Sequence, residues 1–292
     1  IVGGVVKSIN TNSVLGSGDT FVVEADEFNR SFLELTPTIA VVNNIDLEHI
    51  DCYKDLADLK NAFIQFANSV PFYGMVSICK DSDNAASIIP LIDKPLVTYG
   101  IESDNVDFKA KNIIHSDGKV AFDVVHQKKS YSFSMNIPGS YNVLNALAAI
   151  SVCKTMGLSI ENISKSLKDF SGVKRRFDIK KHNETITIID DYAHHPVEVS
   201  SVIEAVKSNW DRRLLAIFQP HLFSRTKQFH KDFAKSLFDA DIIFITEIFA
   251  SREKLDPSIS SKRISEHLRE LNHENVFDIT TESLIQDITS HY

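Results

Sequence analysis

The sequence has little cysteine and no long hydrophobic run. Its three cysteines, Cys52, Cys79 and Cys153, are widely spaced, which argues against both a disulfide framework and a CxxC zinc site. No apolar run reaches the length of a membrane-spanning helix, and the first residues lack a charged segment followed by an apolar one. We therefore expect a cytoplasmic protein without membrane insertion.

Basic residues are also scarce relative to acidic ones. The 31 Lys and Arg residues face 39 Asp and Glu residues, and the formal net charge is -8. No dense Lys/Arg run reverses this balance, so the composition gives no support for nucleic-acid binding. Small neutral or metal-escorted substrates fit better. What is present is an ordinary globular composition, with 43% hydrophobic and 24% charged residues.

The length of 292 residues exceeds a usual single-domain core, so two domains are expected. Short apolar runs that end in polar turns alternate with helical patterns, which predicts the α/β class. The expected strands are 21–27, 39–46, 75–81, 185–190, 214–219 and 241–249, and the expected helices are 55–70, 137–157, 197–209, 225–239 and 258–271. Between about 96 and 133, short β-like pieces around Asp117-Gly118 predict hairpins added to the sheet. A Gly-containing turn at 170–173 marks the predicted domain boundary.

Acidic residues and a histidine follow two successive predicted strands. Glu24, Asp26 and Glu27 follow the first, and Asp46, Glu48, His49 and Asp51 follow the second. Because loops converge beyond the carboxyl ends of strands in an open α/β sheet, a carboxylate and an imidazole there could hold Mg²⁺ together with substrate phosphates. The alternative is that these side chains cap the following helices.

The second half of the chain repeats this arrangement with other groups. Candidate residues are Lys174, Arg175 and Arg176 before a strand, Asp190, Asp191, His194 and His195 after the next, and Gln219, His221 and Arg225 after another. Guanidinium groups suit phosphate or carboxylate recognition, although a solvated basic turn is the alternative for Arg175 and Arg176. The β-branched run 185–189 is expected to be buried on both faces, and Pro196 to open a helix. The two adjacent histidines point in different directions, so only one need face a site.

Six motifs in this order resemble the Mur ligases of peptidoglycan synthesis. They are "EADE", "NNIDLEHIDCY", "GSYNVLNALAA", "GVKRRFD", "DDYAHHPVEV" and "FQPHLFSRT". The resemblance is closest to the members that join L-alanine to UDP-N-acetylmuramate, and it runs from the first residues to about Glu247. It implies an ATPase-type central domain with a mostly parallel sheet over residues 1–171 and a Rossmann-like C-terminal domain over 172–292. The implied partners are these two substrates, and the expected oligomeric state is a monomer or a weak homodimer.

The resemblance also implies the chemistry and its residues. In this family ATP phosphorylates a substrate carboxylate, and an amine then attacks the acyl phosphate. The implied roles are Mg²⁺ binding for Glu24 and His49, adenine binding for Asn142 and Asn145, contact with the ATP phosphates and ribose for Arg176 and Asp191, and orientation of the amino acid and the acyl phosphate for Tyr192, His194, His221 and Arg225. His49, Arg176, His194 and His221 are the implied catalytic set. Closure of the domains would complete the site.

The sequence departs from the family at the phosphate loop. No GxxxxGK[ST] motif is present, since the single Gly-Lys pair, Gly118-Lys119, is followed by Val120 and has Ile113 at the position of the leading glycine. Tyr141 also replaces a histidine that often precedes the first asparagine of the adenine motif. Because the chain starts with Ile1, we expect a fragment, truncated at both ends, that does not ligate alone.

Four other interpretations are weighed against this one. A ligase that attaches recycled peptide to UDP-N-acetylmuramate shares a similar histidine motif, and folylpolyglutamate synthetase shares the architecture. A nucleotide-binding or scaffold protein without catalysis would explain the missing phosphate loop. The stretch "LGSGDTF" starts like a dinucleotide loop but lacks the third glycine, which leaves a dehydrogenase remote.

Overall fold

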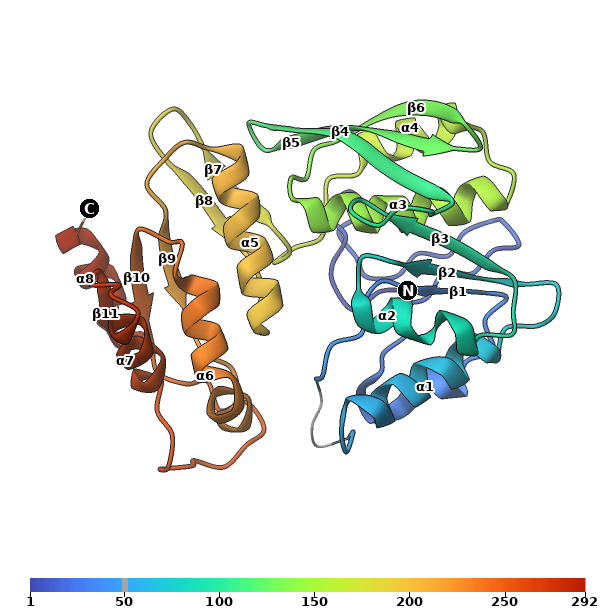
Figure 1. Ribbon diagram of the computed structural model, residues 1–292. Helices are drawn as coiled ribbons and strands as arrows, with labels where there is room; N and C mark the ends of the chain where they lie inside the picture. Colours follow the sequence, from blue (N-terminus) through green and yellow to red (C-terminus); the bar gives the residue numbers. More distant parts are fainter. Residues whose placement is uncertain (49–51, 292) are drawn as a thin grey trace. The chain divides into compact units, whose positions relative to one another are not determined.

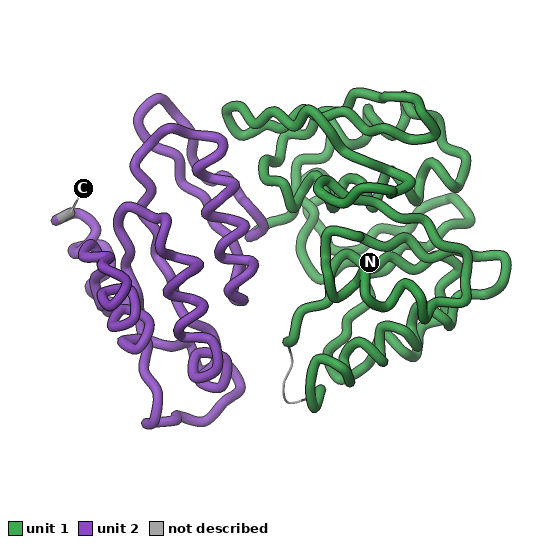
Figure 2. The backbone as a smooth tube through the Cα atoms, viewed as in Figure 1, with its two compact units in different colours: residues 1–174 green, residues 175–292 purple. Residues whose placement is uncertain are grey.

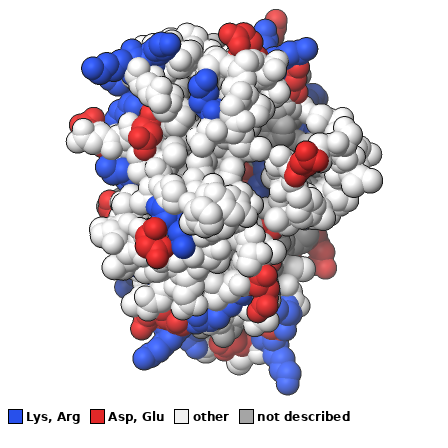
Figure 3. Space-filling model, turned by 90° about the vertical axis from the view of Figure 1, so that its right-hand side faces the viewer, with Lys and Arg blue, Asp and Glu red and all other residues white. Residues whose placement is uncertain are grey.

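The computed structural model describes residues 1–48 and 52–291. The chain forms two compact units, which are considered separately: unit 1 is Ile1–Lys174 and unit 2 is Arg175–Tyr292 (Figure 2). Strands and helices alternate in both units, which confirms the predicted α/β class. Among the described residues, no helix has both the length and the apolar character needed to cross a membrane. On the face in Figure 3, basic and acidic side chains are interspersed.

Unit 1 is built on a six-stranded sheet with its strands in sequence order (Figure 1). The strands are β1 (Ile39–Val42), β2 (Met75–Cys79), β3 (Leu96–Gly100), β4 (Phe108–Ser116), β5 (Lys119–His126) and β6 (Lys129–Met135). Strands β1 to β4 pair in parallel, whereas β5 and β6 continue the sheet as antiparallel hairpins. Asp117 and Gly118 form the first hairpin turn, both with positive φ. The mostly parallel sheet and the added hairpins are confirmed.

The helices of unit 1 pack on the sheet through two apolar clusters. They are η1 (Phe28–Glu34), α1 (Leu56–Asn68), α2 (Asp83–Ile88), η2 (Ile89–Leu91), α3 (Ser140–Thr155) and α4 (Ile160–Asp169). One cluster joins η1 and α1 to β1 and β2, with Phe32 and Phe66 rings 5.0 Å apart. The other joins α3 and α4 to the sheet from β3 to β6. Asp55 caps α1 by accepting a hydrogen bond from the Asp58 backbone N–H, so capping of this helix by Asp46 or Glu48 is wrong.

The predicted strand at residues 21–27 is wrong. This segment has no regular secondary structure, and the side chains of Phe21 and Val22 are 71% and 70% exposed. Two of its backbone bonds run to Ile1, whose amino group donates to the Val22 carbonyl and whose carbonyl accepts from the Glu24 N–H. Among the described residues β1 pairs only with β2. An apolar run forms a strand only when another strand pairs with it, and none does so here.

Unit 2 has a three-stranded parallel sheet and a separate hairpin (Figure 1). Its elements are β7 (Asp178–His182), β8 (Thr187–Asp190), α5 (Pro196–Asn209), β9 (Leu215–Phe218), α6 (Phe223–Leu237), β10 (Ile242–Ile245), α7 (Lys262–Glu270), β11 (Val276–Asp278) and α8 (Leu284–His291). The parallel sheet has the order β11-β10-β9, and β7 pairs antiparallel with β8. Its core joins α5, α6 and α7 to this sheet.

Two expectations for residues 185–196 have different outcomes. Pro196 opens α5, as predicted. The expected burial of 185–189 on both faces is wrong, because β8 lies in a two-stranded antiparallel sheet and Ile188 is 44% exposed. An antiparallel pair can leave one face in solvent, and a β-branched run does not distinguish this from a central parallel strand.

Candidate functional site

The two asparagines predicted to bind adenine lie together at the start of α3. Gly139, with φ of +104°, precedes the helix and permits the sharp turn into it. The Asn142 Nδ2 donates to the Pro138 carbonyl at 2.7 Å, and the Asn145 Nδ2 donates to the Asn142 Oδ1 at 3.4 Å. Asn145 is exposed, so an amide edge faces solvent.

Asn43 and Tyr99 extend this pair and were missed by the sequence analysis. The Asn43 Nδ2 donates to the Asn145 Oδ1 at 3.3 Å, and the Tyr99 hydroxyl donates to the Asn43 Oδ1 at 2.6 Å. Tyr99 is fully buried, and this burial raises the pKa of its hydroxyl, which stays protonated. Asn43 directly follows β1, a position that could have drawn attention as a strand end. Tyr99, inside β3, gave no such signal.

The proposed metal ligands are only partly placed by the structure. Glu24 lies in an exposed loop, where its carboxylate accepts a hydrogen bond from the Gly3 backbone N–H. His49 lies outside the described residues. Within the described ranges, no three His, Cys, Asp or Glu side chains are grouped so as to hold a metal ion. A lone carboxylate fits Mg²⁺ that is held mainly by water and phosphate oxygens, and does not fit a cage built from protein ligands alone.

In unit 2, polar side chains that follow β8 and β9 converge. Tyr192 and His194 follow β8, and their ring centroids are 5.0 Å apart. His221 follows β9, with its ring centroid 5.9 Å from that of His194. Arg225, on the first turn of α6, places its Nη1 3.1 Å from the His221 Nδ1. All four predicted amino-acid-binding residues therefore form one contiguous cluster within unit 2.

The environment of His221 defines its protonation. Burial lowers the pKa of His221, and the nearby charges of Arg225 and His194 lower it further. The neutral imidazole is thus favoured. Because a guanidinium group only donates hydrogen bonds, the Nδ1 that faces Arg225 is the acceptor, and Nε2 carries the proton. His221 can therefore donate a hydrogen bond from Nε2.

Arg175 and Arg176 lie beside Tyr192. Their guanidinium carbons are 4.5 Å and 5.7 Å from the centroid of the Tyr192 ring, which is cation–π geometry. The Arg176 Nη1 is 3.4 Å from the Glu198 Oε1, and its side chain is 53% exposed. This degree of exposure leaves the guanidinium accessible to an anionic ligand.

Asp191 connects two loops of this cluster. Its Oδ2 accepts the Phe177 N–H at 2.6 Å, and its Oδ1 accepts the Ala193 N–H at 2.7 Å. Burial, together with the nearby charge of Glu198, raises the pKa of Asp191 by more than these two bonds and the charge of Arg176 lower it. The Asp191 carboxylate thus links the loop of residues 175–177, called the RRF loop below, to the loop that carries His194.

Glu198 also belongs to this cluster, and the sequence analysis did not single it out. Its Oε2 accepts the backbone N–H groups of His194 and His195 at 2.9 and 3.1 Å, which forms a capping box at the start of α5. His195 is 9% exposed and packs edge-on against Phe229. His194 instead contacts Tyr192 and His221, so the two histidines do point in different directions. A glutamate three residues after the helix cap was the available signal.

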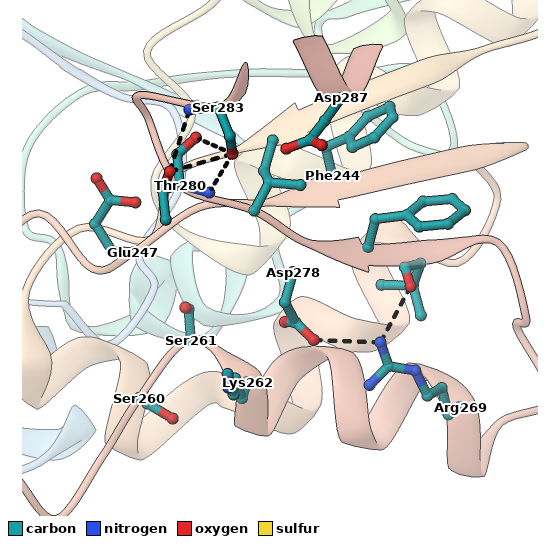
Figure 4. Close-up of a pocket in the computed structure, with 13 residues that line it drawn as sticks. Phe244, Glu247, Ser260, Ser261, Lys262, Arg269, Asp278, Thr280, Ser283 and Asp287 are labelled. Atoms are coloured by element: carbon teal, nitrogen blue, oxygen red, sulfur yellow. Dashed lines mark hydrogen bonds and ion pairs between the residues drawn. The ribbon is translucent and has the colours of Figure 1, made fainter. Parts of the chain in front are cut away.

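Unit 2 also has a hollow that lies away from this cluster. Figure 4 shows it between β10, β11 and α7, with a volume of about 730 Å³. Lys262 and Arg269 supply basic groups, but the Arg269 Nη2 is 3.2 Å from the Asp278 Oδ2 and also donates to the Val276 carbonyl. None of the described residues that line it belongs to the predicted site. The convergence of imidazole and guanidinium groups locates the chemistry better than this hollow does.

Comparison with known proteins agrees with the order of the two units. Residues 8–153 match the family described as Mur ligase middle domain, and residues 175–290 match the Mur ligase, glutamate ligase domain. A UDP-N-acetylmuramate–L-alanine ligase of Geotalea uraniireducens is 42% identical over 289 residues, which cover 98% of this chain and 63% of that protein. A protein of the same name from Desulforapulum autotrophicum is 41% identical, with 94% and 61% covered.

Solved structures give the same result. UDP-N-acetylmuramate-alanine ligase MurC from Thermotoga maritima has a TM-score of 0.78 and 26% identity, covering 98% of this chain and 61% of that one. Folylpolyglutamate synthase of Mycobacterium tuberculosis, with a TM-score of 0.70, 17% identity and 89% and 58% covered, shares the fold alone. The chain spans about three fifths of the length of the curated relatives it matches. With both family domains matched in order, this chain belongs to the Mur ligase family.

Proposed function

We propose that this chain is the catalytic part of an ATP-dependent ligase that joins L-alanine to UDP-N-acetylmuramate and releases ADP and phosphate. The observation that carries the proposal is the 42% identity, over 98% of the chain, to a ligase named for this reaction. The convergence of Arg176, His194, His221 and Arg225 in unit 2 supports it. The use of ATP implies a cytoplasmic reaction.

Unit 1 is proposed to bind the nucleotide. Asn142 and Asn145 offer amide donors and acceptors to the adenine ring, and Glu24 and His49 are proposed to hold Mg²⁺ together with phosphate oxygens and water. The metal would neutralise charge on the transferring phosphoryl group. The fit of Glu24 to this role rests on its exposed carboxylate, which is available for a ligand besides the Gly3 N–H.

The proposed reaction has two steps. A carboxylate oxygen of UDP-N-acetylmuramate attacks the γ-phosphorus of ATP, ADP leaves, and an acyl phosphate forms. The amine nitrogen of L-alanine then attacks the acyl carbon, loses a proton, and inorganic phosphate leaves. Negative charge lies on oxygen atoms in both steps, so the guanidinium groups of Arg176 and Arg225 are proposed to stabilise it.

The two histidines are proposed to act differently. The His194 Nδ1 is 2.7 Å from the Tyr192 carbonyl, which can only accept, so Nδ1 carries a proton and Nε2 is the nitrogen that can take one from the amine. His221 has the opposite tautomer, and its Nε2–H is proposed to hold a substrate oxygen. Tyr192 is proposed to shield one side of the amino acid, and Asp191 to contact the ribose.

The test requires a phosphate loop, because the 292 residues contain no GxxxxGK[ST]. The part of the Geotalea uraniireducens ligase that precedes its alignment can be fused before Ile1, and ADP release measured with UDP-N-acetylmuramate and L-alanine. We expect turnover that needs both substrates, no turnover by the 292-residue chain alone, and a loss of about a hundredfold or more in the fusion with Arg176→Ala.

Other outcomes would overturn the proposal in defined ways. Preference for a peptide over L-alanine would indicate a recycling ligase. The fusion could instead bind nucleotide and release no ADP while the intact Geotalea enzyme is active in the same assay. That result would indicate a non-catalytic nucleotide-binding protein. Arg176→Lys serves as the matched control, because it keeps the charge and removes the planar fork of donors.

A further inference from the structure

Four side chains form a continuous chain of hydrogen bonds from the interior of unit 1 to the start of α3. The bonds run from the Tyr99 hydroxyl to the Asn43 Oδ1, from the Asn43 Nδ2 to the Asn145 Oδ1, from the Asn145 Nδ2 to the Asn142 Oδ1, and from the Asn142 Nδ2 to the Pro138 carbonyl. Every amide in this chain accepts on oxygen and donates from nitrogen. The chain therefore has one direction.

Both ends of the chain favour the same direction, and each contributes to it. The Pro138 carbonyl can only accept, so Asn142 must turn its Nδ2 toward it, and this choice orients Asn145 and then Asn43. At the other end, burial keeps the Tyr99 hydroxyl protonated, and its oxygen is closer to the Asn43 Oδ1, at 2.6 Å, than to the Val42 carbonyl, at 3.4 Å. An amide flipped against this order would set two acceptors or two donors against each other.

The fixed direction leaves a defined hydrogen-bonding edge on Asn145. Its Nδ2 uses one of two hydrogens and its Oδ1 one of two acceptor sites within the chain, so one donor and one acceptor stay available on an exposed residue. Adenine presents an N6–H donor next to an N1 or N7 acceptor, which an amide matches with two bonds. A guanine held in the same placement presents the reverse order on its Watson–Crick edge, an O6 acceptor next to an N1–H donor, and in that placement the flipped amide matches it.

We propose that Tyr99 and Asn43 are positioning residues that hold the Asn145 amide in the orientation that selects adenine over guanine. This inference rests on the proposed nucleotide site at Asn142 and Asn145 and extends it to two further residues that are hydrogen-bonded to it in series. Tyr99 stabilises this orientation from β3, and Asn43 links it from the end of β1 to α3.

The experiment measures side-chain amide signals by ¹H–¹⁵N NMR of the 292-residue chain while AMP or GMP is added. In the wild type, AMP shifts the amide signals of Asn142 and Asn145, and it binds about tenfold or more tightly than GMP, within the discrimination expected of one amide–base pair. Tyr99→Phe keeps the ring and removes the donor, and we expect the AMP-to-GMP ratio to fall at least threefold. Tyr73→Phe, at a tyrosine that is 71% exposed, is the matched control and leaves the ratio unchanged.

A second variant tests the same inference without touching the core. Asn43→Asp at this exposed position still accepts from Tyr99 but cannot donate to Asn145, so the Asn145 amide is driven to flip and the preference moves toward GMP. Unchanged ratios in both variants, with Asn142 and Asn145 still responding to AMP, would overturn the positioning role and leave the nucleotide site standing. No response of these two signals to AMP in the wild type would count against the nucleotide site itself.

Discussion

The hydrogen bond between His221 and Arg225 predicts a difference between two substitutions of the histidine. The Arg225 side chain is 8% exposed, and its Nη1 lies 3.1 Å from the His221 Nδ1. His221→Leu removes this acceptor and leaves a buried, charged donor facing an apolar side chain. We expect a loss of about 1.5–3 kcal/mol in the free energy of unfolding of unit 2. In His221→Asn the Oδ1 lies near the former Nδ1, so the expected loss is within about 1 kcal/mol.

Trp210 provides the assay. It is the single tryptophan of the chain, is 9% exposed, and stacks on Phe177 in unit 2 with ring centroids 6.4 Å apart. Urea unfolding followed by its fluorescence therefore reports on unit 2, and the shift of the midpoint gives the change in stability. Equal losses in the two variants would refute the reasoning, because they would show that the acceptor at Nδ1 contributes nothing beyond the volume of the ring.

The same environment predicts a pH dependence. Burial, Arg225 and His194 lower the pKa of His221 below the usual 6.5. An unfolded histidine takes up a proton near 6.5 while the folded one stays neutral, so the stability from neutral His221 is complete above 6.5 and is lost as the pH falls toward the lowered pKa. In an NMR titration, His194→Gln should raise the pKa of His221 by removing a neighbouring charge. A proton found on Nδ1 rather than Nε2 would contradict the assignment.

Glu198, Asp81 and Gly74 each support a local structure whose loss can be measured. Glu198→Ala removes the capping box of α5 and should cost about 1 kcal/mol by Trp fluorescence. Asp81→Ala leaves three backbone N–H groups without their acceptor. The free energy of unfolding of unit 1, measured by calorimetry, should fall by about 2–4 kcal/mol. Burial raises the pKa of Asp81, but these bonds lower it by more. The contribution of Asp81 to the free energy of unfolding is therefore present above pH 3.8 and is lost as the pH falls through the lowered pKa. Gly74→Ala places a Cβ against the Thr38 carbonyl and should lower the melting temperature measured by circular dichroism, whereas Gly18→Ala, in open space, should not.

Periodicity in the sequence predicted the elements that are stabilised by their own pattern. Strand β2 is buried along its whole length, and its apolar run indicated this. The run at 21–27 has the same character, yet Phe21 and Val22 are exposed because no described strand pairs with them. Pairing is a property of the tertiary structure, so a local pattern alone cannot supply it.

The site was predictable to the extent that its residues stand at strand ends. His194, His221 and Arg225 were found in this way, and they lie together. Tyr99 was not, because a buried tyrosine in a strand has the same sequence pattern whether its hydroxyl orients a ligand-binding amide or serves only the core. Glu198 was missed because its capping-box position, three residues after the helix cap, was not considered beside the charged motif residues.

The convergence of basic groups in unit 2 depends on backbone conformations that no propensity favours. Arg175 and Phe177 have φ of +62° and +43°, a left-handed region that costs a non-glycine residue about 1–3 kcal/mol. The Phe177 ring is buried and its N–H donates to Asp191, which also accepts the N–H of Ala193. One carboxylate thus holds both the strained RRF loop and the loop that presents His194. An Asp191 substitution could lower activity either because it releases these loops or because it removes a ribose contact. Only an Asp191 variant with an unchanged free energy of unfolding can therefore test the nucleotide role.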